Sequence, residues 1–234
     1  MESRRVACVI PTFNADAFVA EAIESVLVQT YAETQIIVVD DGSTDCTEDV
    51  VRPFGRKITY LPQPHRGAAA AKNAGIRASR SGFVAFLDAD DLWHPDKLTR
   101  QMALFEKQPG MDLLYTDYKN FWARGLEEEE KEYQDHPLSE ATSGWSISTL
   151  LAKRSVFRRF GFFEVNVNER HQSLMWALRA AKGGAAVQVL HDVLMYRRLH
   201  QGNQSRGWTV DAEFLELVKA WKDYRQTRTE KDAE

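Results

Sequence analysis

The sequence is poor in cysteine and has no long apolar run. Its two cysteines, Cys8 and Cys46, have neither the spacing of a zinc site nor the density of a disulfide framework. We therefore expect two plain thiols, buried or half-buried, in a protein of a reducing compartment. The first apolar run, Val6–Ile10, stops at Pro11, which is too short for a signal-peptide core or a membrane span, and no later run is longer. The sequence predicts a cytoplasmic protein without a transmembrane segment and leaves peripheral contact with a membrane open.

An excess of basic residues is also missing. The chain has 30 Lys and Arg against 34 Asp and Glu, a formal net charge of −4. Proteins that bind nucleic acid usually carry a clear basic excess, so nucleic acid is not an expected partner. The 234 residues, 44% hydrophobic and 27% charged, are enough for one substantial core. No repeat or low-complexity linker divides them, which predicts a single domain.

The first half of the chain alternates β-rich runs with segments of helical period. This alternation is typical of parallel strands joined by crossover helices, and it predicts a doubly wound α/β sheet. Ser43, Thr44 and Asp45 are suited to cap the second helix, and Pro95 is suited to the first turn of the fourth. The predicted strands are 5–12, 34–40, 58–61 and 83–88, and the predicted helices are 15–29, 45–54, 67–78 and 95–107.

The second half is less regular. The stretch 125–143 contains the acidic run Glu127–Glu130 and little apolar periodicity, so it indicates a mobile loop or insertion with a solvated face. The remaining expected segments are a strand at 112–118, an amphipathic segment at 147–160, a helix at 172–182, a β-rich segment at 185–199 and a last helix near 211–225.

A turn with a hydroxyl, an aromatic ring and an amide follows the first predicted strand. It consists of Pro11, Thr12, Phe13 and Asn14. Ligands of open α/β sheets bind beyond the carboxyl ends of the strands, and such a turn can hold a base by stacking and hydrogen bonds. Proline and asparagine are also common turn formers, so this motif alone favours the structural interpretation.

Two adjacent carboxylates, Asp40 and Asp41, end the second predicted strand. Holding two such charges side by side is costly without donors or cations, which favours a ligand contact. Capping of the next helix by Asp41, Ser43 or Thr44 is an equally good explanation.

Small residues open the third predicted helix, after Arg66 and Gly67. They allow a phosphate to approach the free N–H groups at the helix start, where Arg66 and Lys72 add positive charge. An alanine-rich packed helix explains the alanines equally well, but it does not explain Lys72 and Asn73 among them.

Three carboxylates within four residues, Asp88, Asp90 and Asp91, follow the fourth predicted strand. Oxygen ligands at this density suit Mg²⁺ or Mn²⁺, which in turn neutralises a diphosphate. Three acids on a surface turn are the alternative, and their place at the end of a buried strand favours the metal site.

In this order and spacing, the four motifs resemble the family 2 glycosyltransferases, over almost all of residues 7–118. The resemblance implies a GT-A fold, with a mostly parallel, doubly wound sheet: a Rossmann-like nucleotide-binding half at 1–118, a mixed acceptor-side half at 119–207 and a C-terminal helix and tail at 208–234. It implies that Asp41 bonds the nucleobase, that Lys72 lies near the diphosphate and that Asp90 ligates Mn²⁺ or Mg²⁺. The residues it assigns to the nucleotide sugar are Pro11, Thr12, Asn14, Asp41, Lys72, Asp88 and Arg197.

Two stretches of the second half resemble the same family more loosely. Leu151–Phe163 is similar to the segment before the family's acceptor site. Tyr196–His200 is similar to the C-terminal motif whose histidine reaches the metal, which implies roles for Arg197 and His200.

The main departure from the family lies at the expected catalytic base. The family places a Glu-Asp pair just before a Trp-bearing helix, and this aspartate takes the proton of the acceptor hydroxyl. Here Gln172 and Ser173 occupy the pair, and neither can act as a carboxylate base. We expect Glu169 or His171 to substitute, because an imidazole is a competent base near neutral pH.

The resemblance implies an inverting, metal-dependent transfer from a nucleoside-diphosphate sugar, expected to be a UDP-sugar, to an acceptor that is a polysaccharide, a lipid-linked saccharide or a protein. The alternative is a sugar-nucleotide-binding protein with weak or no activity, because the usual base is missing. A nucleotidyltransferase is disfavoured without a Gly- and Lys-rich opening loop, and a nicotinamide dehydrogenase without G-x-G-x-x-G after the first strand.

Overall fold

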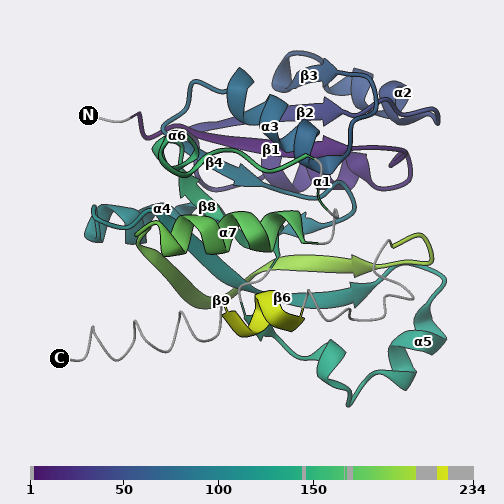
Figure 1. Ribbon diagram of the computed structural model, residues 1–234. Helices are drawn as coiled ribbons and strands as arrows, with labels where there is room; N and C mark the ends of the chain where they lie inside the picture. Colours follow the sequence, from purple (N-terminus) through teal and green to yellow (C-terminus); the bar gives the residue numbers. More distant parts are fainter. Residues whose placement is uncertain (1–2, 144–145, 166, 168–170, 204–214, 221–234) are drawn as a thin grey trace.

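A computed structural model describes residues 3–143, 146–165, 167, 171–203 and 215–220, and shows one sheet with helices on both of its faces (Figure 1). The strands follow the order β3-β2-β1-β4-β8-β6-β9-β5, and β7 pairs with β6 beside this path. The strands are β1 (Val6–Thr12), β2 (Thr34–Asp40), β3 (Thr59–Pro62), β4 (Phe83–Phe86), β5 (Leu92–Trp93), β6 (Leu113–Trp122), β7 (Thr142–Ser143), β8 (Leu151–Lys153) and β9 (Val187–Leu199). The α-helices are α1 (Val19–Leu27), α2 (Thr47–Val51), α3 (Ala68–Ala78), α4 (Lys97–Lys107), α5 (Glu127–Glu132), α6 (Ser155–Phe160) and α7 (Gln172–Lys182), and short 3₁₀ helices lie at Arg52–Lys57, Pro137–Ser139 and Ile147–Thr149.

The first four strands run parallel, so their carboxyl ends meet at one edge of the sheet. β1 lies between β2 and β4, and β3 pairs with the outer side of β2. Asp41 and Asp88 therefore follow strands on opposite sides of β1, with about 10 Å between their backbones at ordinary strand spacing. That gap is wide enough for an extended polar ligand to lie across the strand ends.

The strand β1 shows why helices cover both faces of the sheet. Its residues alternate between two separate cores, because successive side chains of a strand point to opposite faces. Ala7 and Val9 pack with α3, α6 and α7, whereas Cys8 and Ile10 pack with α1 and α4. In Figure 1, α7 accordingly lies in front of the sheet, and α1 lies behind it. The expected doubly wound, mostly parallel α/β fold is confirmed.

The two halves of the chain share this sheet through an antiparallel strand. β8 pairs with β4 on one side and with β6 on the other, both antiparallel. β6 and β9 then form a long parallel pair, and β5 adds to β9 in the opposite direction. Because β5 directly follows Asp91, its pairing with β9 brings the end of β9 to the acidic turn after β4.

Several predicted boundaries differ from the structure. The predicted amphipathic segment 147–160 consists of three elements, a 3₁₀ turn, β8 and α6, and the residues of β8 complete the sheet between β4 and β6. The stretch 125–143, predicted as a mobile loop, contains α5 and β7, and its Tyr133 ring stacks on Trp122 with the ring centroids 6.1 Å apart. Pro95 precedes α4 instead of occupying its first turn, since the helix begins at Lys97.

Three further expectations concern the termini and the thiols. Cys8 is buried as expected, but Cys46 is exposed, because it lies in the turn before α2. Residues 215–220 of the predicted last helix are helical, and the remainder of 211–225 lies outside the described residues. In the described part of the chain, no helix combines the length and apolar character needed to span a membrane.

Candidate functional site

The loop after β1 is fastened to the loop after β2. Asn14 adopts a left-handed backbone with φ of 47°, and its side-chain oxygen accepts the N–H of Thr44 at 2.8 Å. In return, the N–H of Asn14 donates to the hydroxyl of Ser43 at 2.9 Å. The ring of Phe13 remains 44% exposed and stacks on His65 with the centroids 4.2 Å apart. The two loops thus form one rim on which an aromatic face is available for a flat ligand.

Thr12 and Pro11 lie deeper in the same edge. The Thr12 hydroxyl is buried and donates to the carbonyl of Ile10 at 3.2 Å, and Pro11 sits opposite Val39 in the sheet. Among the predicted residues after β1, the side chain of Asn14 is used to join the loops, and Pro11 and Thr12 belong to the strand itself.

Asp41 holds the segment that leads into α3. The residue is 2% exposed, and its carboxylate accepts hydrogen bonds from the Gln63 amide at 2.6 Å and from the N–H of Gly67 at 2.7 Å. Nδ1 of His65 lies 2.8 Å from the same carboxylate and 3.0 Å from the backbone carbonyl of Asp41. The N–H of Arg66 also donates to both of its oxygens, at 3.1 Å each. The capping role left open for Asp41 is not confirmed, because the N-cap of α2 is Cys46 and has no side-chain cap; Asp45 accepts the N–H of Thr47 at 3.0 Å. Asp41 instead fixes the loop that carries Gly67 and the start of α3.

Lys72 and Asn73, the polar pair within the alanines of α3, are both buried. The Lys72 ammonium lies 5.7 Å from the centroid of the Phe163 ring and acts electrostatically on Asp88. Asn73 exchanges two hydrogen bonds with the backbone of Phe163, at 2.8 and 3.0 Å. Asn73 therefore joins α3 to the segment before α7, and Lys72 places a positive charge behind the acidic turn.

The three carboxylates after β4 have three different environments. Asp88 accepts the hydroxyl of Ser148 at 3.1 Å, and burial raises the pKa of its carboxyl, with a further contribution from Asp90. Lys72 and Arg197 act against this rise. Asp91 is 3% exposed and accepts the backbone N–H of Arg198 at 3.0 Å, and burial raises the pKa of its carboxyl well above the usual value. The Asp91 carboxyl is thus used to bind the backbone of Arg198, so Asp88 and Asp90 are the two carboxylates available to a ligand.

Asp90 meets His200 directly after the end of β9. Its carboxylate oxygen lies 3.1 Å from Nε2 of His200 and accepts the side-chain N–H of Asn203 at 3.2 Å. The side chains of Asp90 and His200 are 33% and 16% exposed, so both reach solvent. The two residues predicted as metal ligands thus lie next to each other. Among the residues that the structure describes, however, no group of three or more His, Cys, Asp or Glu side chains is close enough to hold a metal ion alone.

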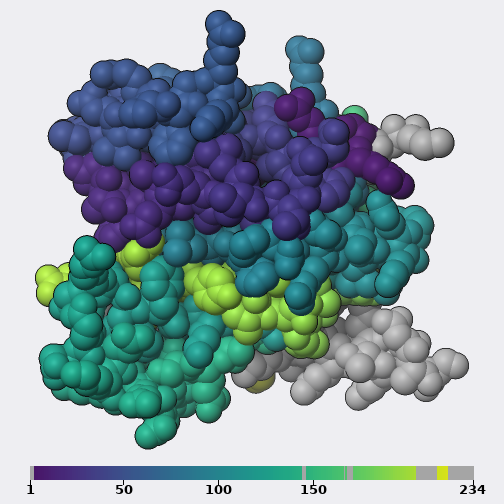
Figure 2. Space-filling view, turned by 180° about the vertical axis from the view of Figure 1, so that it is seen from behind, coloured from purple at the N-terminus to yellow at the C-terminus, as the bar shows by residue number. Residues whose placement is uncertain are grey.

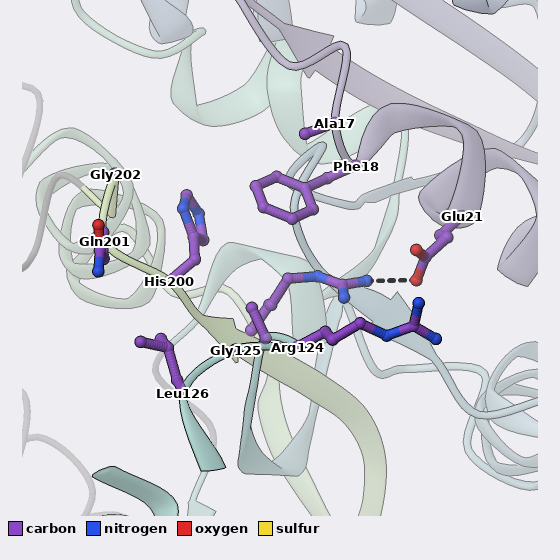
Figure 3. A pocket seen from close by; sticks show the side chains of 11 residues that line it. Ala17, Phe18, Glu21, Arg124, Gly125, Leu126, His200, Gln201 and Gly202 are labelled. Carbon is purple, nitrogen blue, oxygen red and sulfur yellow. Dashed lines mark hydrogen bonds and ion pairs between the residues drawn. The ribbon is translucent and has the colours of Figure 1, made fainter. Parts of the chain in front are cut away.

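A cavity of about 790 Å³ opens beside His200 (Figure 3). Its walls come from the start of α1, from the turn after β6 and from the end of β9. Seen from behind, the turn after β6 belongs to the teal and green lobe below the purple β1–α1 region (Figure 2). Of its lining residues, the sequence predicted a role only for His200, and the doubled arginine before His200 was the signal that could have found Arg198. The lining residues are Ala17, Phe18, Glu21, Ala123, Arg124, Gly125, Leu126, Arg198, His200, Gln201 and Gly202.

Of the two residues expected to replace the missing base, the structure describes His171. His171 directly precedes the helix and is 1% exposed, and the Gln172 amide donates to the carbonyl of Val167 at 3.3 Å. Glu169 lies outside the described residues. α7, which begins directly after His171, and α1, which lines the cavity beside His200, cover opposite faces of the sheet.

The arrangement described so far is that of an α/β protein with a polar, acidic site at the carboxyl edge of its sheet. Residues 7–165 match the family described as Glycosyl transferase family 2. The chain belongs to this family of glycosyltransferases, as the resemblance implied.

Related proteins agree with this assignment. An uncharacterized glycosyltransferase of Rickettsia typhi is 28% identical, over 97% of this chain and 73% of its own length. The Escherichia coli UDP-Glc:α-D-GlcNAc-diphosphoundecaprenol β-1,3-glucosyltransferase WfgD is 35% identical, over 51% of this chain and 47% of its own.

Solved structures show the same fold at lower identity. TarS residues 1–349 from S. aureus, in complex with UDP-GlcNAc, match with a TM-score of 0.72 at 19% identity, over 91% of this chain and 64% of that one. The mannosyltransferase PcManGT from Pyrobaculum calidifontis, in complex with GDP-Man and Mn²⁺, matches with a TM-score of 0.64 at 22% identity, over 87% and 60%. The chain thus spans less than two thirds of the length of these structures, and the likeness confirms the GT-A fold.

Proposed function

We propose that the protein transfers a sugar from a nucleoside-diphosphate sugar to an acceptor hydroxyl with inversion at the anomeric carbon. The observation that carries this proposal is that Asp90 lies 3.1 Å from His200 at the sheet edge. Asp88 is next to this pair, and Lys72 and Arg197 act electrostatically on its carboxyl. Membership of glycosyltransferase family 2 supports it independently.

The nucleotide is proposed to lie across the ends of β1 and β2. Phe13 offers a ring face, and Asp41 fixes the loop between β3 and α3 against which a base would rest. In this proposal Pro11, Thr12 and Asn14 shape the pocket floor and rim, and Lys72 and Arg197 face the phosphates. A UDP-sugar is the preferred donor of the proposal, because TarS is described with UDP-GlcNAc, and a GDP-sugar is the comparison to test, because PcManGT is described with GDP-Man.

A divalent ion, Mn²⁺ or Mg²⁺, fits the donor atoms that Asp90 and His200 present. A carboxylate oxygen and an imidazole nitrogen converge at 3.1 Å, and both side chains are partly exposed. Two protein ligands suffice for such an ion when substrate phosphates and water supply the rest. When bound, the ion would neutralise the charge of the departing nucleoside diphosphate. Lys72 and Arg197 contribute positive charge to the same region from the protein itself.

The acceptor step is proposed to use His171 or Glu169 as the base in place of the Gln172 and Ser173 pair. His171 is nearly enclosed at the start of α7, so an acceptor hydroxyl must come close to this helix end for the imidazole to take its proton. Alignment of the reactants alone is worth about 7–11 kcal/mol, so transfer proceeds even with an imperfect base. The acceptor class is proposed to be a polysaccharide, a lipid-linked saccharide or a protein, and WfgD is named for a lipid-linked one.

The direct test is release of nucleoside diphosphate from UDP-glucose, UDP-GlcNAc and GDP-mannose, each with Mn²⁺ and with a chelator. We expect release from one UDP-sugar that depends on Mn²⁺ and increases when a suitable saccharide acceptor is added. Failure of every donor to release nucleotide, with or without acceptors, would contradict transfer. Metal-dependent nucleotide binding without release would favour the inactive binding protein instead.

A further inference from the structure

Arg198 makes contacts with four separate parts of the fold. Its backbone N–H donates to Asp91 at 3.0 Å, and its Nε donates to the carbonyl of Asp90 at 2.9 Å. Its guanidinium also forms an ion pair with Glu21 of α1 at 2.7 Å, marked by the dashed line in Figure 3. Arg198 thus joins the acidic turn after β4 to α1.

Two aromatic rings enclose the same guanidinium. Its Cζ lies 5.0 Å from the centroid of Phe18 and 4.7 Å from that of Phe121. The side chain is 7% exposed, whereas Glu21 is 55% exposed. A buried guanidinium held by two rings and two hydrogen bonds has little freedom to move, so it fixes the positions of the groups that it contacts.

The contacts of Arg198 converge on the pair Asp90 and His200. Phe18, which lies against the guanidinium, also packs on the His200 ring with the centroids 4.5 Å apart. Asn203 donates both to the carbonyl of Arg198 at 3.1 Å and to the carboxylate of Asp90 at 3.2 Å. Both members of the proposed metal pair are therefore oriented by neighbours of one side chain.

We infer that Arg198 is a positioning residue: it joins Glu21 to the backbone of Asp90 and holds the Asp90 carboxylate facing His200. This inference rests on the proposed function, and it assigns a role to a residue that the sequence interpretation passed over in favour of Arg197. Lysine cannot replace the arginine, because a single ammonium lacks the rigid fork that reaches Asp90 and Glu21 at the same time.

The test compares Arg198→Lys with the wild-type protein in two titrations. Mn²⁺ binding in the presence of UDP is followed by electron paramagnetic resonance of the free ion, and UDP binding without metal is followed by calorimetry. We expect Mn²⁺ to bind about 10–100-fold more weakly to Arg198→Lys, the usual cost of losing a partner that orients a metal ligand. UDP affinity without metal should change by less than about twofold, because Arg198 is not proposed to touch the nucleotide.

Arg100→Lys is the matched control, since Arg100 forms an ion pair with Asp192 at 3.0 Å on the surface. It should leave both titrations unchanged. Glu21→Gln keeps an oxygen acceptor for Arg198 but removes the charge, so we expect an intermediate loss of Mn²⁺ affinity and an unchanged fold.

Three results would overturn the inference. Wild-type Mn²⁺ affinity in both Arg198→Lys and Glu21→Gln would remove the positioning role and leave the proposed function intact. An equal loss of UDP affinity with and without metal in Arg198→Lys would show that Arg198 supports the fold in general and does not specifically orient the metal ligands. Absence of any Mn²⁺-dependent gain in the wild-type protein would contradict the metal site itself, and the inference with it.

Discussion

The two halves of the sheet edge hold their polar side chains in different ways. In the first half, partners are close in sequence: Asn14 bonds Thr44, and Asp41 bonds Arg66 and Gly67, 25 to 30 residues apart. Asp90 instead depends on partners more than a hundred residues away, His200 and Asn203. The first half is thus a nearly self-contained rim, whereas the proposed metal pair exists only once β9 has joined the sheet.

The largest effect is expected where the two halves meet. Asp90→Asn should weaken Mn²⁺-dependent UDP binding by more than about 100-fold, because loss of a direct ligand exceeds the 10–100-fold cost of losing an outer partner. The neighbouring Asp91→Asn is the control, since an amide oxygen can still accept the Arg198 N–H and burial already raises the pKa of this carboxyl well above its usual value. Calorimetry with and without Mn²⁺ measures both. Equal losses in the two variants would contradict the distinct roles of these neighbours.

The second effect concerns the acceptor side, where the family's carboxylate base is missing. Ser173→Asp places an acid in the first turn of α7, a position where the helix dipole also favours negative charge. If the missing base limits transfer, the turnover rate should rise by about 100-fold, the lower end of general-base contributions. Ser173→Asn controls for size. An unchanged turnover rate in Ser173→Asp, together with a large loss in His171→Gln, would show that His171 already serves as the base.

The third effect tests how self-contained the first rim is. Asp41→Asn replaces an acceptor of several hydrogen bonds by a group with one oxygen, so we expect a loss of about 2–3 kcal/mol in the free energy of unfolding. Discrimination between UDP and GDP should also weaken, because the loop at 63–67 loses its anchor. Chemical denaturation and competition binding measure the two. Wild-type stability with altered discrimination would assign Asp41 to the nucleobase alone.

The last effect concerns stability alone and rests on Lys97, a buried side chain packed on Trp93. Its ammonium lies 4.1 Å from the centroid of the Trp93 ring and donates to Gln101 at 2.9 Å, and burial lowers its pKa to about 7. Between this value and the ordinary lysine pKa, the unfolded chain binds a proton that the folded protein does not. Stability from this group therefore rises with pH across that window and is constant below it.

Lys97→Met should remove this dependence. The stability difference between wild type and variant should shift in favour of the wild type as pH rises above about 7, by up to about 1.4 kcal/mol per pH unit. Lys107→Met, an exposed lysine on the same helix, provides the control. Parallel pH profiles for wild type and Lys97→Met would show that Lys97 stays charged in the fold.

The sequence predicted the first half well because its signals are local. The strand 34–40 matches β2 at both ends, and the acids after the strands lie at one edge because parallel strands place them there. In the second half, the helix 172–182 also matches α7 at both ends. The segment 147–160 was predicted only as amphipathic, and its strand could not be foreseen, because β8 is set by pairing with β4 and β6 and not by its own three residues. His200 and Arg197 were reached through family resemblance alone.

Other features could not be predicted from local pattern at all. The position of Arg198 depends on Glu21, 177 residues away, and on two rings, Phe18 directly before α1 and Phe121 in β6. The functional roles of Glu169 and His171 stay predictions, as does the division of the chain at 118 and 207. The assembled sheet decides which residues far apart in sequence come into contact, and the spacing of residues along the chain does not reveal these contacts.

The central claim is that Asp90 and His200 jointly hold a divalent ion against the diphosphate of a sugar nucleotide. Anomalous diffraction from a crystal soaked with Mn²⁺ and UDP tests it most directly. The account predicts a manganese peak bonded to both side chains, with the uracil over the ends of β1 and β2. A peak elsewhere, or UDP bound without any ion near Asp90, would contradict it.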